Sequence, residues 1–319
     1  MRTKETAESL IRETEKIIIG KGETIRLVLA AILSGGHVLL EDLPGSGKTT
    51  LVKSLALALG CDFKRLQFTP DLLPSDVVGM TVFNQKTGDF EVKNGPVFTN
   101  ILLADEINRA IPRTQSALLE AMEERQVSIE GESRKLPEPF FVLATQNPVE
   151  KESTFPLPAA QLDRFFLKLS MGYPSAEEEL SMLTNLGDET PNEMIQAAAS
   201  PEELQHLRDE IRAVTLSEEI KRYIVGLVQS TRSHSSLRLG ASPRASRTLF
   251  QGGKALAAMA GRDYVIPEDI RHLFLPALSH RVTLTGEARF SEKTAEDILK
   301  EILEETEVPP YRSERFLQK

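Results

Sequence analysis

The sequence LPGSGKT, residues 43–49, lies between an apolar run at 37–40 and a helix-forming run at 48–59, and it decides the fold of the first half of the chain. A strand, a glycine-rich turn and a helix in this order form a P-loop, whose backbone N–H groups turn inward and can hold phosphate oxygens. Glycine at positions 45 and 47 lets the backbone approach phosphate without a Cβ in the way. The candidate nucleotide-binding residues are Pro44, Gly45, Ser46, Gly47, Lys48, Thr49 and Thr50.

The side chains after the second glycine would carry the phosphate chemistry. Lys48 would reach the β- and γ-phosphates of a nucleotide, and the hydroxyl of Thr49 would ligate Mg²⁺. The full pattern is GxxxxGK[ST], and Asp42 stands where its first glycine is expected. Pro44 and Gly45 can supply the turn that this glycine would otherwise make. A chance match is the alternative, but the strand and helix on either side of the motif favour phosphate binding.

An acidic pair, Asp105 and Glu106, follows the apolar run NILLA at residues 100–104. In an open α/β sheet ligands gather at the carboxyl ends of the strands, so both carboxylates are expected near the phosphates. Asp105 suits coordination of Mg²⁺, and Glu106 could polarise a water molecule for in-line attack on the γ-phosphate. A strand end that is merely solvated is the alternative for the acidic pair alone. Its combination with the P-loop favours hydrolysis over transfer to a bound acceptor.

The apolar runs of the first half predict a parallel sheet. They are continuous rather than alternating, which is typical of strands buried on both faces, and helix-forming segments separate them. The predicted fold class is α/β, a P-loop αβα sandwich with a mainly parallel sheet. Strands are expected at residues 37–40, 65–68, 100–105, 140–145 and 165–171, and helices at 48–59 and 112–125.

Two hairpins and a helical second domain complete the predicted organisation. Residues 80–93 and 127–136 each hold two short strand-like runs around a turn, which predicts two hairpins inserted into the α/β half. The strand pattern stops after Tyr173, and the pairs Ser175/Glu178 and Ser200/Glu203 match capping boxes that open helices. We therefore expect an α/β domain over residues 1–172 and a smaller all-α lid domain over 173–319, with helices at 217–233, 243–260, 267–280 and 292–305.

Composition narrows the class of protein further. The formal net charge of −9 over 319 residues argues against a general nucleic-acid partner. Cys61 is the single cysteine, so neither a disulfide nor a Cys-based zinc site can form within one chain. The five histidines never fall at metal-ligand spacing. No apolar run approaches the ~18 residues of a membrane span, and the charged N-terminus has no apolar signal region, so we expect a cytoplasmic protein.

Longer blocks of sequence carry a resemblance to a known family. They are LLADEINRAIPRTQSALLEAMEERQVSI at 102–129, ATQNP at 144–148, FPLPAAQLDRFF at 155–166 and GASPRA at 240–245, with FTPDLLPSDVVG at 68–79. In length and order they resemble the signature blocks of the MoxR family of AAA+ ATPases, over about residues 17–278. The resemblance implies a homo-oligomer, a hexameric ring, that hydrolyses ATP with Mg²⁺.

The resemblance also implies roles for single residues. Asn147 matches sensor 1, which orients the attacking water, and Arg164 matches the arginine finger that reaches the ATP of a neighbouring subunit. Arg244 matches sensor 2 at the start of a lid helix, and Ile19-Gly20 matches the stretch that packs on the adenine. Each of these residues also has an interpretation without a catalytic role. Asn147 would be a turn residue before proline, and Arg164 would form a local salt bridge. Arg244 would be a solvated helix arginine, and Ile19-Gly20 would be a helix C-cap.

The implied function is chaperone-like remodelling, or metal insertion and maturation, of a protein client, often a protein with a von Willebrand factor A domain. The two predicted hairpins fall where MoxR proteins, magnesium-chelatase motor subunits and MCM helicases carry inserts that face the ring pore or the substrate. A nucleotide-dependent binding scaffold with negligible turnover and a nucleic-acid motor stay open as alternatives. The combination of Glu106, Asn147, Arg164 and Arg244 argues against the scaffold, and the mixed charge of the hairpins argues against the motor.

Overall fold

The computed structural model describes residues 2–42, 45–147, 154–184 and 194–309. Within them, five parallel strands form one sheet with the order β2-β5-β8-β1-β9. The parallel sheet predicted from the apolar runs is confirmed, with every predicted strand present. The strands are β1 (Val38–Glu41), β2 (Phe63–Gln67), β5 (Ile101–Asp105), β8 (Phe141–Gln146) and β9 (Leu167–Leu169).

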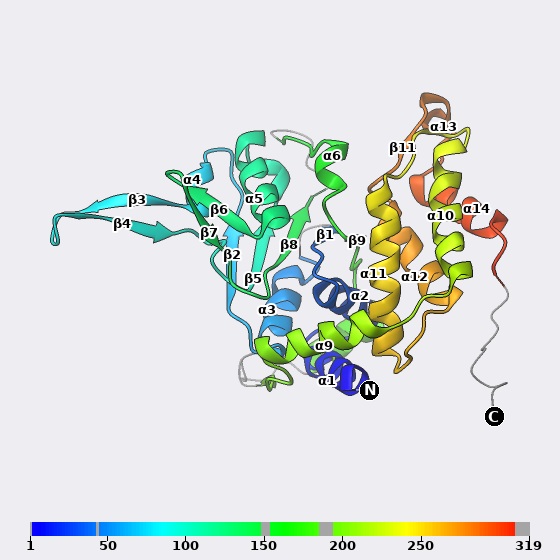
Figure 1. The fold of residues 1–319 in the computed structure, drawn as a ribbon, viewed down its shortest axis with the longest axis horizontal. Coiled ribbons are helices and arrows are strands. Elements are labelled where there is room, and N and C mark those ends of the chain that lie inside the picture. Colours follow the sequence, from blue (N-terminus) through cyan, green and yellow to red (C-terminus); the bar gives the residue numbers. More distant parts are fainter. Residues whose placement is uncertain (1, 43–44, 148–153, 185–193, 310–319) are drawn as a thin grey trace. The chain divides into compact units, whose positions relative to one another are not determined.

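Helices pack against this sheet (Figure 1), so that β5 is buried at every residue and β1 and β8 at every residue except the last. Leu102 of β5 and Val142 of β8 belong to one apolar cluster with Leu118 of α5 (Pro112–Glu124). The alternate residues Leu103 and Leu143 are equally buried but lie outside this cluster. Since alternate side chains point to opposite faces of a strand, the sheet is covered on both faces, as the continuous apolar runs predicted.

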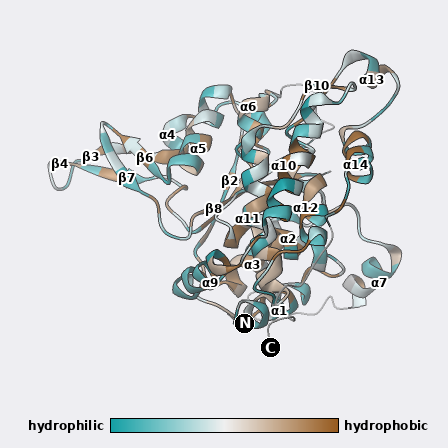
Figure 2. Ribbon diagram, turned by 45° about the vertical axis from the view of Figure 1, so that its right-hand side comes forward, coloured by the Kyte–Doolittle hydropathy of each residue, from teal (hydrophilic) through white to brown (hydrophobic). Residues whose placement is uncertain are grey.

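The other helices between α1 and α9 differ in how much of their surface is apolar. Helix α2 (Gly22–Leu33) is buried along most of its length and is predominantly hydrophobic in Figure 2, whereas α9 (Pro201–Ala213) is mostly hydrophilic. The capping box predicted at Ser175 and Glu178 is confirmed by two reciprocal hydrogen bonds of 2.7 and 3.2 Å. The remaining helices are α1 (Arg2–Glu15), α3 (Lys48–Ala58), α4 (Pro74–Val78), the 3₁₀ turn η1 (Ile107–Arg109), α6 (Ala159–Leu162) and α7 (Ala176–Thr184).

Both predicted hairpins are present. Strands β3 (Gly79–Asn84) and β4 (Asp89–Asn94) form a two-stranded arm that extends away from the sheet (Figure 1). Strands β6 (Gln126–Ile129) and β7 (Glu132–Lys135) form a shorter hairpin after α5. Neither hairpin joins the main sheet, so both are insertions into the α/β architecture.

The chain divides into two compact units, Glu5–Arg208 and a second unit that begins at Asp209 and includes the first residues of α1. The second unit holds α10 (Glu218–Ser233), α11 (Pro243–Met259), α12 (Pro267–Leu278), α13 (Gly286–Phe290) and α14 (Ala295–Glu305). The predicted domain boundary at residue 172 stays a prediction. Among the described residues, no helix is both long enough and apolar enough to cross a bilayer.

One feature of the second unit departs from the all-helical expectation. Strands β10 (Leu237–Leu239) and β11 (Thr283–Leu284) pair antiparallel between the helices. Strands of three and two residues are too short to give a periodic signal in the sequence. They join the segment after α10 to the segment after α12, and they leave the helical character of the unit unchanged.

Candidate active site

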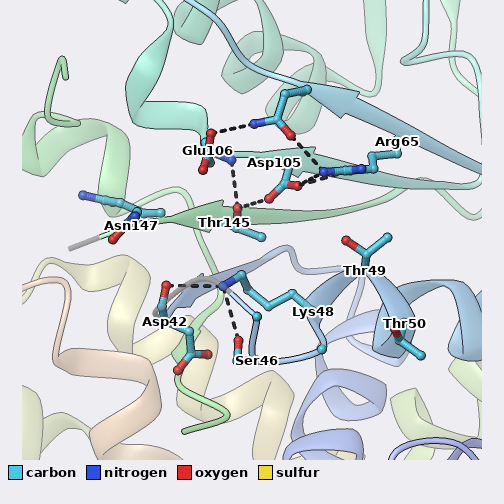
Figure 3. A pocket seen from close by; sticks show the side chains of 14 residues that line it. Asp42, Ser46, Lys48, Thr49, Thr50, Arg65, Asp105, Glu106, Thr145 and Asn147 are labelled. Atoms are coloured by element: carbon cyan, nitrogen blue, oxygen red, sulfur yellow. Dashed lines mark hydrogen bonds and ion pairs between the residues drawn. The ribbon is translucent and has the colours of Figure 1, made fainter. Parts of the chain in front are cut away.

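A pocket of about 420 Å³, within the range of small-molecule sites, lies at the carboxyl ends of β1, β5 and β8. Lys48 and Thr49 lie on one side of it, and Asp105 and Glu106 lie on the other (Figure 3). The parallel strands bring the P-loop and the acidic pair together, as expected for an open α/β sheet. Its lining comprises Asp42, Gly45, Ser46, Gly47, Lys48, Thr49, Thr50, Arg65, Gln67, Asp105, Glu106, Thr145, Gln146 and Asn147.

The P-loop backbone is shaped for an anion. Gly45 and Gly47 have φ values of +84° and +82°, in the left-handed region that favours glycine. A Cβ at either position would meet no atom within 4 Å, so the backbone conformation and not packing requires glycine. Gly47 offers no capping side chain to the first N–H groups of α3, which leaves that helix end suited to phosphate. Pro44, also predicted to line the site, lies outside the described residues.

Asp42, which replaces the first glycine of the motif, has a structural role of its own. Its carboxylate accepts hydrogen bonds from the Ser170 hydroxyl at 2.6 Å, the Met171 N–H at 2.7 Å and the Gly172 N–H at 3.1 Å. Its carbonyl accepts a hydrogen bond of 3.3 Å from the Lys48 ammonium. Asp42 therefore ties the end of β1 to the segment that follows β9, and it fixes the lysine beside the loop.

Asp105 is buried, at 8% exposed, and each of its carboxylate oxygens has a partner. Oδ1 accepts a hydrogen bond of 2.6 Å from the Thr145 hydroxyl. Oδ2 accepts from the Arg65 guanidinium, with Nη2 at 2.6 Å and Nε at 3.1 Å. The carboxylate is thus held in one orientation by a neutral donor from β8 and a cation from β2.

Glu106 adopts an unusual backbone conformation just beyond β5. Its φ of 55° and ψ of 50° lie in the left-handed region, which is uncommon for a residue with a Cβ. Its N–H donates to the Thr145 hydroxyl at 2.8 Å. Its side-chain oxygen accepts from the Gln67 amide at 2.6 Å and from Arg109 at 2.9 Å. The acidic side chain is therefore turned out of the strand direction and held beside the pocket.

Three polar residues of this network were not identified from the sequence: Arg65, Gln67 and Thr145. The first two lie two positions apart on β2, so they point to the same face, and Gln67 pairs in register with Asp105. Thr145 follows the pair Ala104/Ala144, which places it opposite the end of β5. The sequence does show polar residues at the carboxyl ends of these strands. Assigning them to the site requires the order and register of the strands, which the sequence alone does not give.

Comparison with known proteins identifies the family. Residues 37–167 match the model of the ATPase family associated with various cellular activities (AAA), and residues 229–302 match the AAA lid domain. The chain is 51% identical over 303 residues to the uncharacterized protein YeaC of Bacillus subtilis, with 95% of each covered. It is 41% identical over 313 residues to the chaperone MoxR1 of Mycobacterium tuberculosis, with 95% of this chain and 82% of the relative covered. The chain belongs to the MoxR family of AAA+ ATPases.

A solved structure supports the same assignment at the level of the fold. The crystal structure of a Cytophaga hutchinsonii protein, described provisionally as an ATPase, superposes with a TM-score of 0.91 at 42% identity, over 97% of this chain and 96% of that chain. As in other AAA+ proteins, the P-loop and the acidic pair of this MoxR protein thus belong to an α/β unit that is followed by a lid.

Of the residues that the resemblance assigned, Asn147 lines the pocket of this MoxR protein; it is buried and directly follows β8. Arg164 is not among the described residues that line it, and its Nε lies 3.1 Å from Glu123 Oε2 of α5. Ile19 and Gly20 form part of the turn between α1 and α2 and are also outside the described lining.

Arg244 belongs to the second compact unit, in the first turn of α11. The Ser242 hydroxyl accepts a hydrogen bond of 3.1 Å from the Arg244 N–H and so caps the helix at its N-terminus. Pro243 is the first helical residue, as predicted. The contact of Arg244 with nucleotide stays a prediction.

The donor atoms of the pocket fit Mg²⁺. This ion prefers hard oxygen ligands and is usually held by one or two carboxylates together with substrate phosphates. The Asp105 carboxylate and the Thr49 hydroxyl, both on the pocket wall, are such ligands. Across the described part of the chain, no group of three His, Cys, Asp or Glu side chains could hold a metal by itself. A magnesium ion here would therefore be bound jointly with the nucleotide.

Proposed function

We propose that this MoxR-family protein binds ATP with Mg²⁺ and hydrolyses it to ADP and phosphate. The observation that carries the proposal is the position of the acidic pair across one pocket from the P-loop lysine. A lone P-loop would serve kinases and GTPases equally, whereas Glu106 beside Asp105 provides a base for water. Bound Mg²⁺, held by Thr49 and Asp105, would neutralise charge on the phosphate oxygens.

The remaining pocket residues have separate tasks in this proposal. Lys48 and the N–H groups of residues 45–49 hold the phosphates. Glu106 accepts a proton from the attacking water, and the Asn147 carboxamide orients that water against the γ-phosphate. Gln67 and Arg109 both donate to Oε2 of the Glu106 carboxylate, so these two contacts orient the carboxylate beside the pocket and leave its other oxygen to accept from water.

We further infer that the site is shared between subunits of a hexameric ring. In its own chain Arg164 is held by a salt bridge to Glu123 in which both side chains are about one-third exposed. Such a pair stabilises a protein by ~0–1 kcal/mol, so its release costs little. A planar, permanently charged guanidinium then suits the γ-phosphate of the neighbouring subunit. In this proposal Arg244 contacts the nucleotide from the lid, and Ile19-Gly20 packs on the adenine.

The proposed use of hydrolysis is the remodelling or maturation of a protein client. The relative MoxR1 of Mycobacterium tuberculosis is named a chaperone, which supports this class of activity. Metal insertion, and a client with a von Willebrand factor A domain, rest on the resemblance alone. The arm formed by β3 and β4 is a candidate contact for such a client, because Phe83 and Phe90 near its end are 55% and 75% exposed. The cytoplasmic location predicted from the sequence stays a prediction.

Glu106→Gln tests the hydrolytic proposal. The amide keeps the size of the side chain but cannot accept a proton, so we expect ATP affinity within about threefold of wild type and turnover reduced by roughly 10²-fold or more. Binding is measured by titration calorimetry and turnover by phosphate release, with Lys48→Ala as the variant that loses binding. If the wild-type protein binds ATP and shows no turnover at any protein concentration, the nucleotide-dependent scaffold becomes the better account.

A further inference from the structure

The Thr145 hydroxyl is the one side-chain group that contacts both members of the acidic pair among the described residues. It donates to Asp105 Oδ1 at 2.6 Å and accepts from the Glu106 N–H at 2.8 Å. Thr145 is 1% exposed and lies on β8, between β5 and β1, where it pairs in register with Leu40 just ahead of the P-loop. Both contacts are direct hydrogen bonds of the side chain, and neither belongs to the ladder of the sheet.

The two hydrogen bonds have different consequences for the site. The bond to Oδ1 fixes the rotation of the Asp105 carboxylate and so determines where Oδ2 points. The bond from the Glu106 N–H fixes the peptide between the two acids, in a conformation with φ of 55° that a residue with a Cβ rarely adopts. A hydroxyl can donate one hydrogen bond and accept another, so one atom sets both geometries.

We propose that Thr145 is a positioning residue for nucleotide hydrolysis, which orients Asp105 toward Mg²⁺ and Glu106 toward the attacking water. The inference rests on the proposed function, because it assumes that Asp105 ligates the ion. Arg65 holds the other oxygen of Asp105 from β2, but its side chain is about half exposed and can move. Thr145 is buried in the central sheet and cannot, so it provides the fixed reference for the pair.

Thr145→Val tests the proposal, because valine keeps the branched shape and removes the hydroxyl. ATP affinity is measured in MgCl₂ and in EDTA, in a Glu106→Gln background that prevents turnover. We expect the dissociation constant in EDTA to stay within about twofold and that in Mg²⁺ to rise by about tenfold, because only the ion-dependent contacts need Asp105 oriented. With Glu106 present, kcat should fall by roughly 10- to 100-fold.

Two further variants separate positioning from stability. Thr145→Ser keeps the hydroxyl and should restore both the Mg²⁺-dependent affinity and kcat. Thr114→Val removes another buried hydroxyl of the same unit, which donates to the Leu72 carbonyl at 2.7 Å, and should leave both readouts unchanged. If Thr145→Val does not fold, Thr145→Ala replaces it, since alanine removes the hydroxyl without placing a methyl group against the carboxylate.

The outcomes distinguish this inference from the proposed function. Equal loss of affinity in MgCl₂ and EDTA, or wild-type affinity and kcat in the variant without the hydroxyl, would overturn the positioning role while leaving hydrolysis intact. A serine variant as impaired as the valine variant would overturn it as well. Absence of turnover in wild type would sink the proposed function, but the comparison of MgCl₂ with EDTA would still decide whether Thr145 orients Asp105.

Discussion

Asp42 replaces the first glycine of the P-loop motif, and its carboxylate makes contacts that a glycine could not make. A glycine at this position would leave three donors, the Ser170 hydroxyl and the N–H groups of Met171 and Gly172, without the acceptor they have now. Because Asp42 is only 6% exposed, water would not easily replace it. The residue thus belongs to the stability of the strand ends, although it occupies a position in the phosphate-binding motif.

Replacing Asp42 by the glycine of the motif should therefore destabilise the folded protein. We expect Asp42→Gly to lower the free energy of unfolding by about 2–4 kcal/mol, because buried donors to a charged acceptor are left unpaired. Asp42→Asn, which keeps one carbonyl oxygen, should lose less. Urea unfolding of both variants measures the effect. A glycine variant as stable as wild type would show that the carboxylate contacts contribute nothing.

At the scale of the secondary-structure elements, a buried histidine joins the start of the β1 segment to its neighbours. His37 Nε2 lies 3.1 Å from the Met122 carbonyl of α5, and its Nδ1 accepts the Val142 N–H of β8 at 3.0 Å. One ring nitrogen donates and the other accepts, which requires neutral imidazole. Burial, and next the charge of Arg125, lower the pKa of His37 to about 3.

The shifted pKa of His37 predicts a loss of stability in mild acid. Below a pKa of about 6.5 the unfolded chain binds a proton at this histidine and the folded chain does not, so the free energy of unfolding falls as pH falls. The contribution is fully present above pH ~6.5 and declines by about 1.4 kcal/mol per pH unit below it. In His37→Gln this slope should be absent. Between pH 7 and 5.5, urea unfolding should show the stability advantage of wild type over the variant shrinking by about 1 kcal/mol.

An advantage of wild type over His37→Gln that does not change with pH would contradict this account. Arg125 offers a partial control, since burial also lowers its pKa, to about 10, which leaves it charged throughout the range tested. Replacing Arg125 should therefore change stability across this range, and because burial is the first cause of the lowered His37 pKa and remains, most of the slope between pH 7 and 5.5 should persist.

The elements also show what the sequence could and could not predict. The run at 100–105 predicted β5 because continuous apolar residues need a strand buried on both faces, and the hairpin residues predicted two insertions. Strands β10 and β11 were missed because they are too short for a pattern. Gln67 and Arg65 were missed because their role depends on the register of β2 against β5, which no local feature of the sequence specifies.

At the scale of the whole molecule, the residues proposed for hydrolysis do not all line the pocket of one chain among the described residues. The P-loop, the acidic pair and Asn147 line it, and Arg164 does not. If Arg164 completes the site of a neighbouring subunit, turnover per subunit must rise with protein concentration until rings are formed. It must also depend on residues contributed by two different chains.

The most direct test mixes two inactive variants, Glu106→Gln and Arg164→Ala. Each should be inactive alone, because the first lacks the base and the second lacks the finger. In an equal mixture, a head-to-tail ring places an intact Glu106 against an intact Arg164 at about one interface in four, so we expect roughly a quarter of wild-type phosphate release. No recovery in mixed rings, or full turnover by Arg164→Ala alone, would contradict a site shared between subunits.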